Sequence, residues 1–185
     1  LKWVRLDEAT RHNVQMELAR DYLQAGLLDR AEAMSMALAA ENPQYRGESL
    51  KIALQVYEQE RDWHRAIEIA KQVTGGAEEA QIERAISHYL CELAELSLIQ
   101  KDPTSAKDFL VDAIGHFALN PRVSLLQGRI ALEAGDPRSA IHALERIIEQ
   151  EPVYVAESMA LLETARQAMG SEDAYRRYLE HCLTH

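Results

Sequence analysis

The sequence predicts an all-α fold in which helices are paired into repeats of about 34 residues. Two observations lead to this prediction. An alanine recurs at nearly regular intervals, each time early in a segment with amphipathic helical spacing. Two of these segments begin with Asp102-Pro103 and Asp136-Pro137, a pair typical of a helix start because proline in the first turn loses no hydrogen bond. The recurring alanines are Ala31, Ala66, Ala106, Ala140 and Ala174.

A period of about 34 residues built from two helices is typical of tetratricopeptide repeats. Such repeats stack into a helix-turn-helix solenoid, and we expect a right-handed superhelix. The predicted array covers residues 6–185, and residues 1–5 are either the remnant of a preceding repeat or residues added for expression. Its five repeats are predicted at about 12–45, 47–76, 78–119, 121–153 and 155–185.

Local signals place the ends of individual helices. Gly26 is expected to end the first helix of the first repeat, a common role for glycine. Asp62 is expected to cap the second helix of the second repeat, as Asp102 and Asp136 do in the next two. Small residues fall where two helices of a repeat are expected to approach closely. These small residues include Ala19, Ala94 and Gly128.

The interval between Ala66 and Ala106 is the irregular one, longer than the other three. Gly75 and Gly76 are expected to break the preceding helix, and the acidic run that follows suits the start of a new one. Helical spacing of apolar residues from position 82 onward favours a lengthened first helix in the third repeat, over roughly residues 78–99. A loop is the alternative.

Composition limits the function. The net charge of −10 argues against nucleic-acid binding, which needs clustered Lys and Arg. The two cysteines, Cys91 and Cys182, form no CxxC pair, and neither a signal peptide nor an apolar stretch of about 18 residues is present. The chain begins at Leu1 and ends near the last predicted helix without a polar capping helix, so we expect it to be the ordered middle of a larger protein.

The sequence carries no catalytic motif, so we expect a protein that is not an enzyme. Nucleotide-binding glycine loops, the GxSxG elbow and the HExxH metal motif are all missing. His181 and His185 are spaced as metal ligands could be, but two solvated residues near a chain end are the simpler interpretation, and we assign no metal site. Cys91 is either a reactive thiol on the inner surface or, more simply, a small packing residue.

In tetratricopeptide arrays the outward positions of each first helix line a groove that binds partner segments. Arg122 and Arg129 are the strongest candidates, because a guanidinium group can bind carboxylates or carbonyls with two donors. The alternative is that both arginines only pair with Glu95 and Glu133. The predicted groove residues are Arg20, Gln24, Lys51, Gln55, His88, Arg122, Arg129 and Arg166.

Four segments go beyond the general repeat pattern. They are residues 19–32 (ARDYLQAGLLDRAE), 54–70 (LQVYEQERDWHRAIEIA), 88–94 (HYLCELA) and 122–129 (RVSLLQGR). Together they resemble the lipopolysaccharide assembly protein B family of Gram-negative bacteria, over most of residues 6–180. The lengthened helix with its HYLCELA string is part of the resemblance.

The resemblance implies a non-catalytic adapter at the cytoplasmic face of the inner membrane. In that family one N-terminal helix anchors the protein, and a C-terminal rubredoxin-like module binds metal through two CxxC pairs. Neither is found in this sequence, so we assign no cofactor. We expect membrane attachment only through an N-terminal anchor helix that this segment does not contain. The implied partners are the protease FtsH, the deacetylase LpxC, whose degradation the family promotes, and other proteins of the lipopolysaccharide pathway. The array could also form a homo-oligomer.

Two other interpretations stay open. The chain could be a tetratricopeptide protein of another envelope assembly pathway, such as pilus or outer-membrane biogenesis. A weaker alternative is a repeat region associated with a glycosyltransferase, although no residue in the sequence supports such catalysis.

Overall fold

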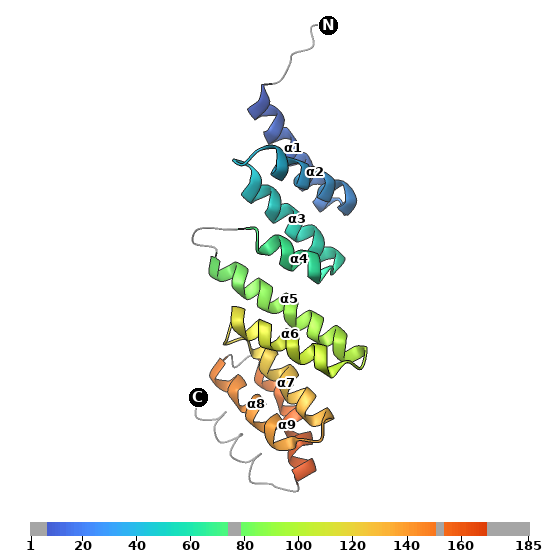
Figure 1. The fold of residues 1–185 in the computed structure, drawn as a ribbon, viewed down its shortest axis with the longest axis vertical. Helices are drawn as coiled ribbons and strands as arrows, with labels where there is room; N and C mark the ends of the chain where they lie inside the picture. The colour runs from blue at the N-terminus through green and yellow to red at the C-terminus, as the bar shows by residue number, and fades with distance from the viewer. Residues whose placement is uncertain (1–6, 74–78, 151–153, 170–185) are drawn as a thin grey trace. The chain divides into compact units, whose positions relative to one another are not determined.

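The computed structural model describes residues 7–73, 79–150 and 154–169, and all their regular structure is helical. Nine helices follow one another within these residues (Figure 1). Their bounds are α1 Glu8–Gln24, α2 Leu28–Glu41, α3 Arg46–Glu60, α4 Trp63–Ala70, α5 Glu79–Ile99, α6 Pro103–His116, α7 Pro121–Glu133, α8 Pro137–Gln150 and α9 Val155–Met169. The predicted all-α fold is confirmed. The second helix expected in the fifth repeat falls in 170–185, outside the described residues.

The recurring alanines occupy one structural position. Ala31, Ala66, Ala106 and Ala140 are each the fourth residue of an even-numbered helix, from α2 to α8. All four are fully buried. Alanine suits this position because it lets the backbones of neighbouring helices approach closely. Ala174 lies outside the described residues.

The predicted helix starts are confirmed by their hydrogen bonds. Asp62, Asp102 and Asp136 each accept a bond from the backbone N–H three residues later, at 3.1 Å in all three. The side chain thereby satisfies one of the donors that a helix start leaves without an intrahelical partner. Gly26 follows the end of α1 with a φ of +71°, a left-handed backbone that glycine adopts without strain.

The lengthened helix is confirmed as α5, the longest helix described, with 21 residues. Its sequence supports this length because apolar side chains continue at helical spacing through Ile86, Leu90 and Leu93, all buried. The predicted break at Gly75 and Gly76 falls outside the described residues. The chain divides into two compact units, residues 1–89 and 90–185, and the division lies within α5.

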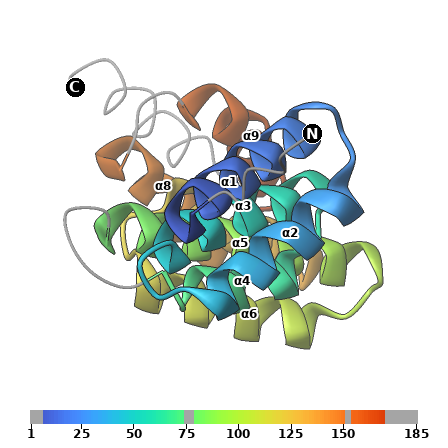
Figure 2. The same cartoon turned by 90° about the horizontal axis from the view of Figure 1, so that it is seen from above.

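In the first unit, successive helices pack against one another. α1 contacts α2 and α3, and α3 contacts α2 and α4 (Figures 1 and 2). Their buried apolar faces form one core, in which α1, α2 and α3 all take part. The core residues are Met16, Ala19, Leu23, Ala31, Leu38, Ile52 and Val56.

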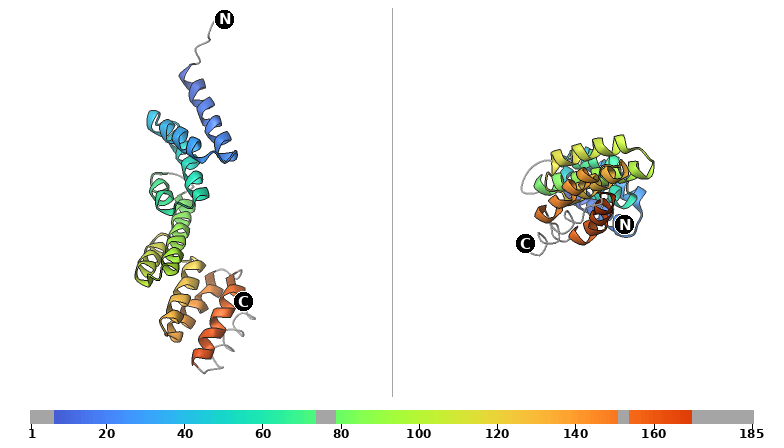
Figure 3. Two further views of the ribbon diagram at one scale, coloured as in Figure 1. Left: turned by 90° about the vertical axis from the view of Figure 1, so that its right-hand side faces the viewer. Right: turned by 90° about the horizontal axis from the view of Figure 1, so that it is seen from below.

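In the second unit, α7 is the central helix. It contacts α6, α8 and α9, and α8 also contacts α9 (Figure 3). Their core contains Ala140, Leu144 and Leu162. Gly128 of α7 lies against Leu144 of α8, as its predicted place at a helix crossing requires. This packing brings the outward faces of α7 and α9 beside the end of α5 and so positions the candidate site.

Candidate functional site

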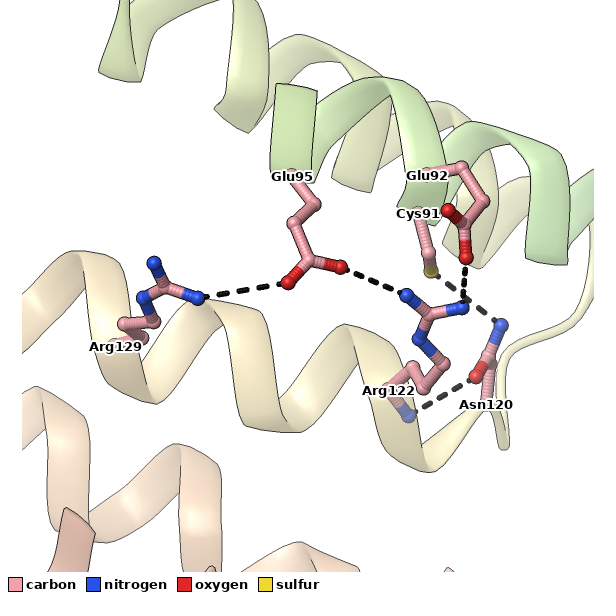
Figure 4. A network of polar contacts seen from close by, with 6 residues as sticks. All are labelled: Cys91, Glu92, Glu95, Asn120, Arg122 and Arg129. Atoms are coloured by element: carbon pink, nitrogen blue, oxygen red, sulfur yellow. Dashed lines mark hydrogen bonds and ion pairs between the residues drawn. The ribbon is translucent and has the colours of Figure 1, made fainter. Parts of the chain in front are cut away.

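The start of α7 is fixed against α5 by Asn120. Its side-chain oxygen accepts from the backbone N–H of Arg122 at 3.0 Å, which caps α7, and Pro121 occupies the first helical turn. The side-chain nitrogen of Asn120 donates to the sulfur of Cys91 on α5 at 3.6 Å (Figure 4). One buried amide therefore sets both the beginning of α7 and its position relative to α5.

Arg122 joins α7 to two carboxylates of α5 (Figure 4). Its Nη1 donates to Glu92 at 2.5 Å and its Nη2 donates to Glu95 at 2.9 Å. Only 22% of the side chain is exposed. Burial lowers the pKa of this guanidinium, but the hydrogen bond to Glu92 and the nearby carboxylate charges outweigh it and raise the pKa overall. Arg122 therefore stays charged and holds the two helices together.

Arg129 lies two turns further along α7 and is held more loosely. Its guanidinium is 3.6 Å from Glu95 and 3.6 Å from Glu133, and 41% of the side chain is exposed. Ion pairs this long and this exposed contribute little to stability. Glu95 thus lies between the two arginines, with a tight bond to one and a longer contact to the other. Of the two, Arg129 is the one whose donors a partner could reach.

A pocket of about 380 Å³ opens beside these arginines, between α5, α7 and α9. It combines charged groups with an apolar wall, a mixture typical of sites that bind a peptide side chain. The guanidinium groups offer donors to a carboxylate or carbonyl, and the leucines and the tyrosine accept an apolar group. The lining residues are Glu95, Arg122, Leu125, Leu126, Arg129, Tyr154, Glu157, Ala160 and Leu161.

Arg166 does not line this pocket, and its place in a partner-binding groove stays a prediction. It lies on α9, 3.8 Å from Glu163 on the same helix. The structure therefore brings together Arg122 and Arg129 but does not add Arg166 to them.

In the first unit, Glu48 plays a part similar to that of Glu95. It lies on α3, 3.5 Å from Arg20 of α1 and 3.1 Å from Lys51, one turn along α3. Arg20 also bonds Glu17 at 2.5 Å. A glutamate between two basic residues therefore occurs in both units. Gln24 and Gln55, the other predicted groove residues of this unit, are exposed.

His88 is exposed on α5 and lies beside an aromatic residue of α4. Its ring meets the Trp63 indole edge-on at 6.4 Å, and Trp63 stacks on Tyr89 at 5.7 Å. Tyr89 in turn donates its hydroxyl to Glu58. Trp63 thus packs α4 against α5, and His88 belongs to the same aromatic cluster.

The sequence analysis did not predict Glu92 as a partner of Arg122, nor the part of the pocket wall that α9 contributes. Glu92 stands three residues before Glu95, a spacing that places both on one helix face and could have indicated a pair of acceptors for Arg122. Glu157 and Leu161 are four residues apart on α9 and share a face in the same way. What the spacing does not show is how closely α9 approaches α7.

Cys91 is a packing residue. It is fully buried, and burial raises the pKa of its thiol to about 12, with the Glu92 and Glu95 charges adding to the effect and Arg122 and Asn120 opposing it. A thiol that stays protonated is a poor nucleophile. The alternative of a reactive cysteine on the inner surface is therefore wrong for Cys91. Cys182, His181 and His185 lie outside the described residues.

Among the described residues, no group of three or more His, Cys, Asp or Glu side chains is arranged to hold a metal ion. Across the same part of the chain, no helix combines the length and the apolar character needed to cross a membrane.

The paired helices, the buried alanine at the fourth position of every second helix and the period of about 34 residues define a tetratricopeptide-type scaffold. Solved structures of the tetratricopeptide protein MamA share this fold. One aligns with a TM-score of 0.57 at 18% identity, covering 94% of this chain and 90% of MamA. Another aligns with a TM-score of 0.55 at 17% identity, covering 98% and 95%.

The chain is similar in sequence to lipopolysaccharide assembly protein B. It is 31% identical to the Escherichia coli K12 protein over 168 residues, which is 90% of this chain and 42% of that protein. The Haemophilus influenzae protein is 28% identical over 166 residues, 89% of this chain and 41% of its own length. The chain thus spans less than half the length of these relatives. No protein-family model matches it.

Proposed function

We propose that this chain is a non-catalytic adapter that binds a partner protein in the pocket between α5, α7 and α9. The observation that carries the proposal is the pairing of an accessible guanidinium, Arg129, with an apolar wall that includes Leu125, Leu161 and Tyr154. A segment that places a carboxylate at Arg129 and an apolar side chain against this wall would satisfy both surfaces.

The two arginines have different parts in this proposal. Arg122 already donates to Glu92 and Glu95, so its first effect is to hold α5 and α7 at the separation that the pocket requires. Arg129 is bound through contacts of 3.6 Å, which a partner carboxylate can replace at small cost. Binding is therefore expected to depend directly on Arg129, and on Arg122 mainly through the shape of the pocket.

The relation to lipopolysaccharide assembly protein B supports a place in the control of lipopolysaccharide synthesis. In this proposal the protein acts at the cytoplasmic face of the inner membrane and promotes degradation of the deacetylase LpxC by the protease FtsH. The repeats supply the docking surface, and catalysis belongs to the protease. LpxC and the cytoplasmic part of FtsH are accordingly the first partners to test.

The test measures the affinity of the chain for LpxC and for FtsH by calorimetry. Arg129→Ala should weaken binding of one of them roughly tenfold or more, because it removes a charged donor from the pocket. Arg166→Ala is the matched control, since it also removes a partly exposed arginine of the second unit but one that does not line the pocket. If both variants and the unchanged chain bind with equal affinity, the pocket is not the binding site. If the chain binds neither LpxC nor FtsH, the proposed role in lipopolysaccharide synthesis is wrong.

A further inference from the structure

A second hollow lies in the second unit, on another face of α7. It consists of two adjoining pockets of about 400 and 330 Å³, which share Lys107, Ile130 and Ala134. We call them together the α6 groove. Its walls come from α6, from α7, from the turn between α5 and α6 and from the start of α8.

The α6 groove and the pocket at Arg129 use different faces of α7. Residues 122, 125, 126 and 129 line the pocket, whereas residues 127, 130, 131, 133 and 134 line the groove. At 100° per residue, the centres of these two sets are roughly 120° apart around the helix. A segment bound in one does not occupy the other.

The α6 groove is apolar at its floor and along part of its rim. Leu98, Leu110 and Ile130 are buried at its floor. At the rim, 66% of Val111 is exposed, and Ala134 is exposed beside both pockets. Covering the exposed valine and the leucine and isoleucine floor with apolar side chains of another molecule would favour binding, because it removes apolar surface from water.

The charged side chains around the groove differ in whether they already have partners. Its two acidic residues already have partners. Asp136 accepts from Ser139 at 3.1 and 2.6 Å, and Glu133 pairs with Arg129. Within the described ranges, the ammonium groups of Lys101 and Lys107 have no ion pair or hydrogen bond. The groove therefore offers two ammonium groups that a carboxylate of another molecule can bind without displacing an existing partner.

We propose that the α6 groove is a docking site for an acidic amphipathic segment of a second protein. Its apolar side chains would cover Val111, Ile130 and Ala134, and its carboxylates would pair with Lys101 and Lys107. This site adds to the proposed function and stands independently of the pocket at Arg129. An adapter needs two surfaces that can be occupied together, and the two faces of α7 provide them.

The experiment selects random peptides displayed on phage against the 185-residue chain and measures the affinity of the enriched peptides by fluorescence polarisation. We expect an enriched class with alternating acidic and apolar residues. Its affinity should fall roughly tenfold or more in the Lys101→Glu/Lys107→Glu variant, because two attractions become two repulsions. Ala134→Tyr, which fills the hollow and leaves both charges, should weaken the same peptides.

Two controls separate this site from the others. Lys71→Glu makes the same kind of charge change at a residue of the first unit that lines neither pocket of the groove, and it should leave the affinity unchanged. Tyr154→Ala, which changes the wall of the pocket at Arg129 but no residue that lines the groove, should also leave this affinity unchanged. A loss of binding at the pocket can then be distinguished from a loss of binding at the groove. The proposal is overturned if no acidic apolar class is enriched or if charge reversal leaves affinity unaltered. It is equally overturned if the lysines bind vesicles of anionic lipid instead of peptides.

Discussion

Gly128 of α7 lies so close to Leu144 of α8 that a Cβ built on the glycine would stand 2.6 Å from Leu144 Cγ. Real Cβ atoms do not approach other heavy atoms so closely. Leu144 is fully buried in the core shared by α8 and α9, so it has little room to move. The hydrogen atom of a glycine is therefore what permits these two helices to pack at this separation.

Gly128→Ala should lower the free energy of unfolding by about 1–3 kcal/mol, because overpacking outweighs the gain in helix propensity of about 1 kcal/mol. Urea unfolding followed by circular dichroism measures the change. Gly115→Ala on α6 is the matched control, since no atom lies within 4 Å of its added methyl group. An equal effect of the two substitutions would show that α7 and α8 do not pack as described.

Arg122→Ala should destabilise the chain more than Arg129→Ala. The first removes two short hydrogen bonds to carboxylates from a mostly buried side chain, a loss of about 1.5–3 kcal/mol. The second removes two long, exposed ion pairs, worth less than about 1 kcal/mol. Thermal and urea unfolding of both variants test the order. Arg122→Lys should fall between them, since it keeps the charge and loses the paired donors. The reverse order would contradict the assignment of Arg122 as the residue that joins α5 and α7.

The aspartate caps should make stability fall in acid. The hydroxyl and backbone N–H of Ser105 donate to Asp102 and lower its pKa below the ordinary 3.8, and Ser139 does the same for Asp136. Because folding favours the ionised form, this stabilisation is complete above the unfolded pKa. It is lost as the pH falls through the lower, folded value.

In the double variant Asp102→Asn/Asp136→Asn, the free energy of unfolding should fall less between about pH 5 and pH 2 than in the unchanged chain. Asparagine keeps the cap hydrogen bond but does not ionise. The midpoint of urea unfolding across this range measures it. Asp108→Asn removes a carboxylate from the middle of α6 and serves as the control. An unchanged pH profile in the double variant would show that the caps do not contribute.

Cys91 should react with thiol reagents only when the chain unfolds. With its pKa raised to about 12 by burial, about one thiol in ten thousand is ionised near pH 8. The rate of reaction with Ellman's reagent, measured on the Cys182→Ser variant, should be very low in buffer and ordinary in concentrated urea. A fast reaction of the folded chain would mean that Cys91 reaches the surface.

Much of the fold could be predicted because its signals are local. Asp102 caps α6 through a residue three positions later, and the spacing of apolar side chains from Ile86 to Leu93 predicts α5 without any distant contact. The alanine interval adds the pairing of helices, since each small residue marks a close crossing. These relations depend on residues within a few turns of one another.

The site could be predicted only in part. Repeat register predicted that Arg122 and Arg129 line one groove, with Glu95 as an alternative ion-pair partner. It also included Arg166, which the structure leaves outside the pocket, and it missed Glu92 and Tyr154. Whether two side chains from different helices meet depends on the distance and angle between those helices. A repeat pattern specifies such quantities only on average.

The sequence by itself determined the class of fold, the helix starts and the one lengthened helix, because propensity, capping and periodicity act over a few neighbouring positions along the chain. Only the tertiary structure decided that Arg122 holds α5 to α7 while Arg129 stays accessible, and that Lys101 and Lys107, which have no partner among the described residues, lie beside an apolar groove. The physical reason is that burial and ion pairing arise from how closely helices approach. That approach is set by the packing of residues such as Gly128 and Leu144, which lie on different helices.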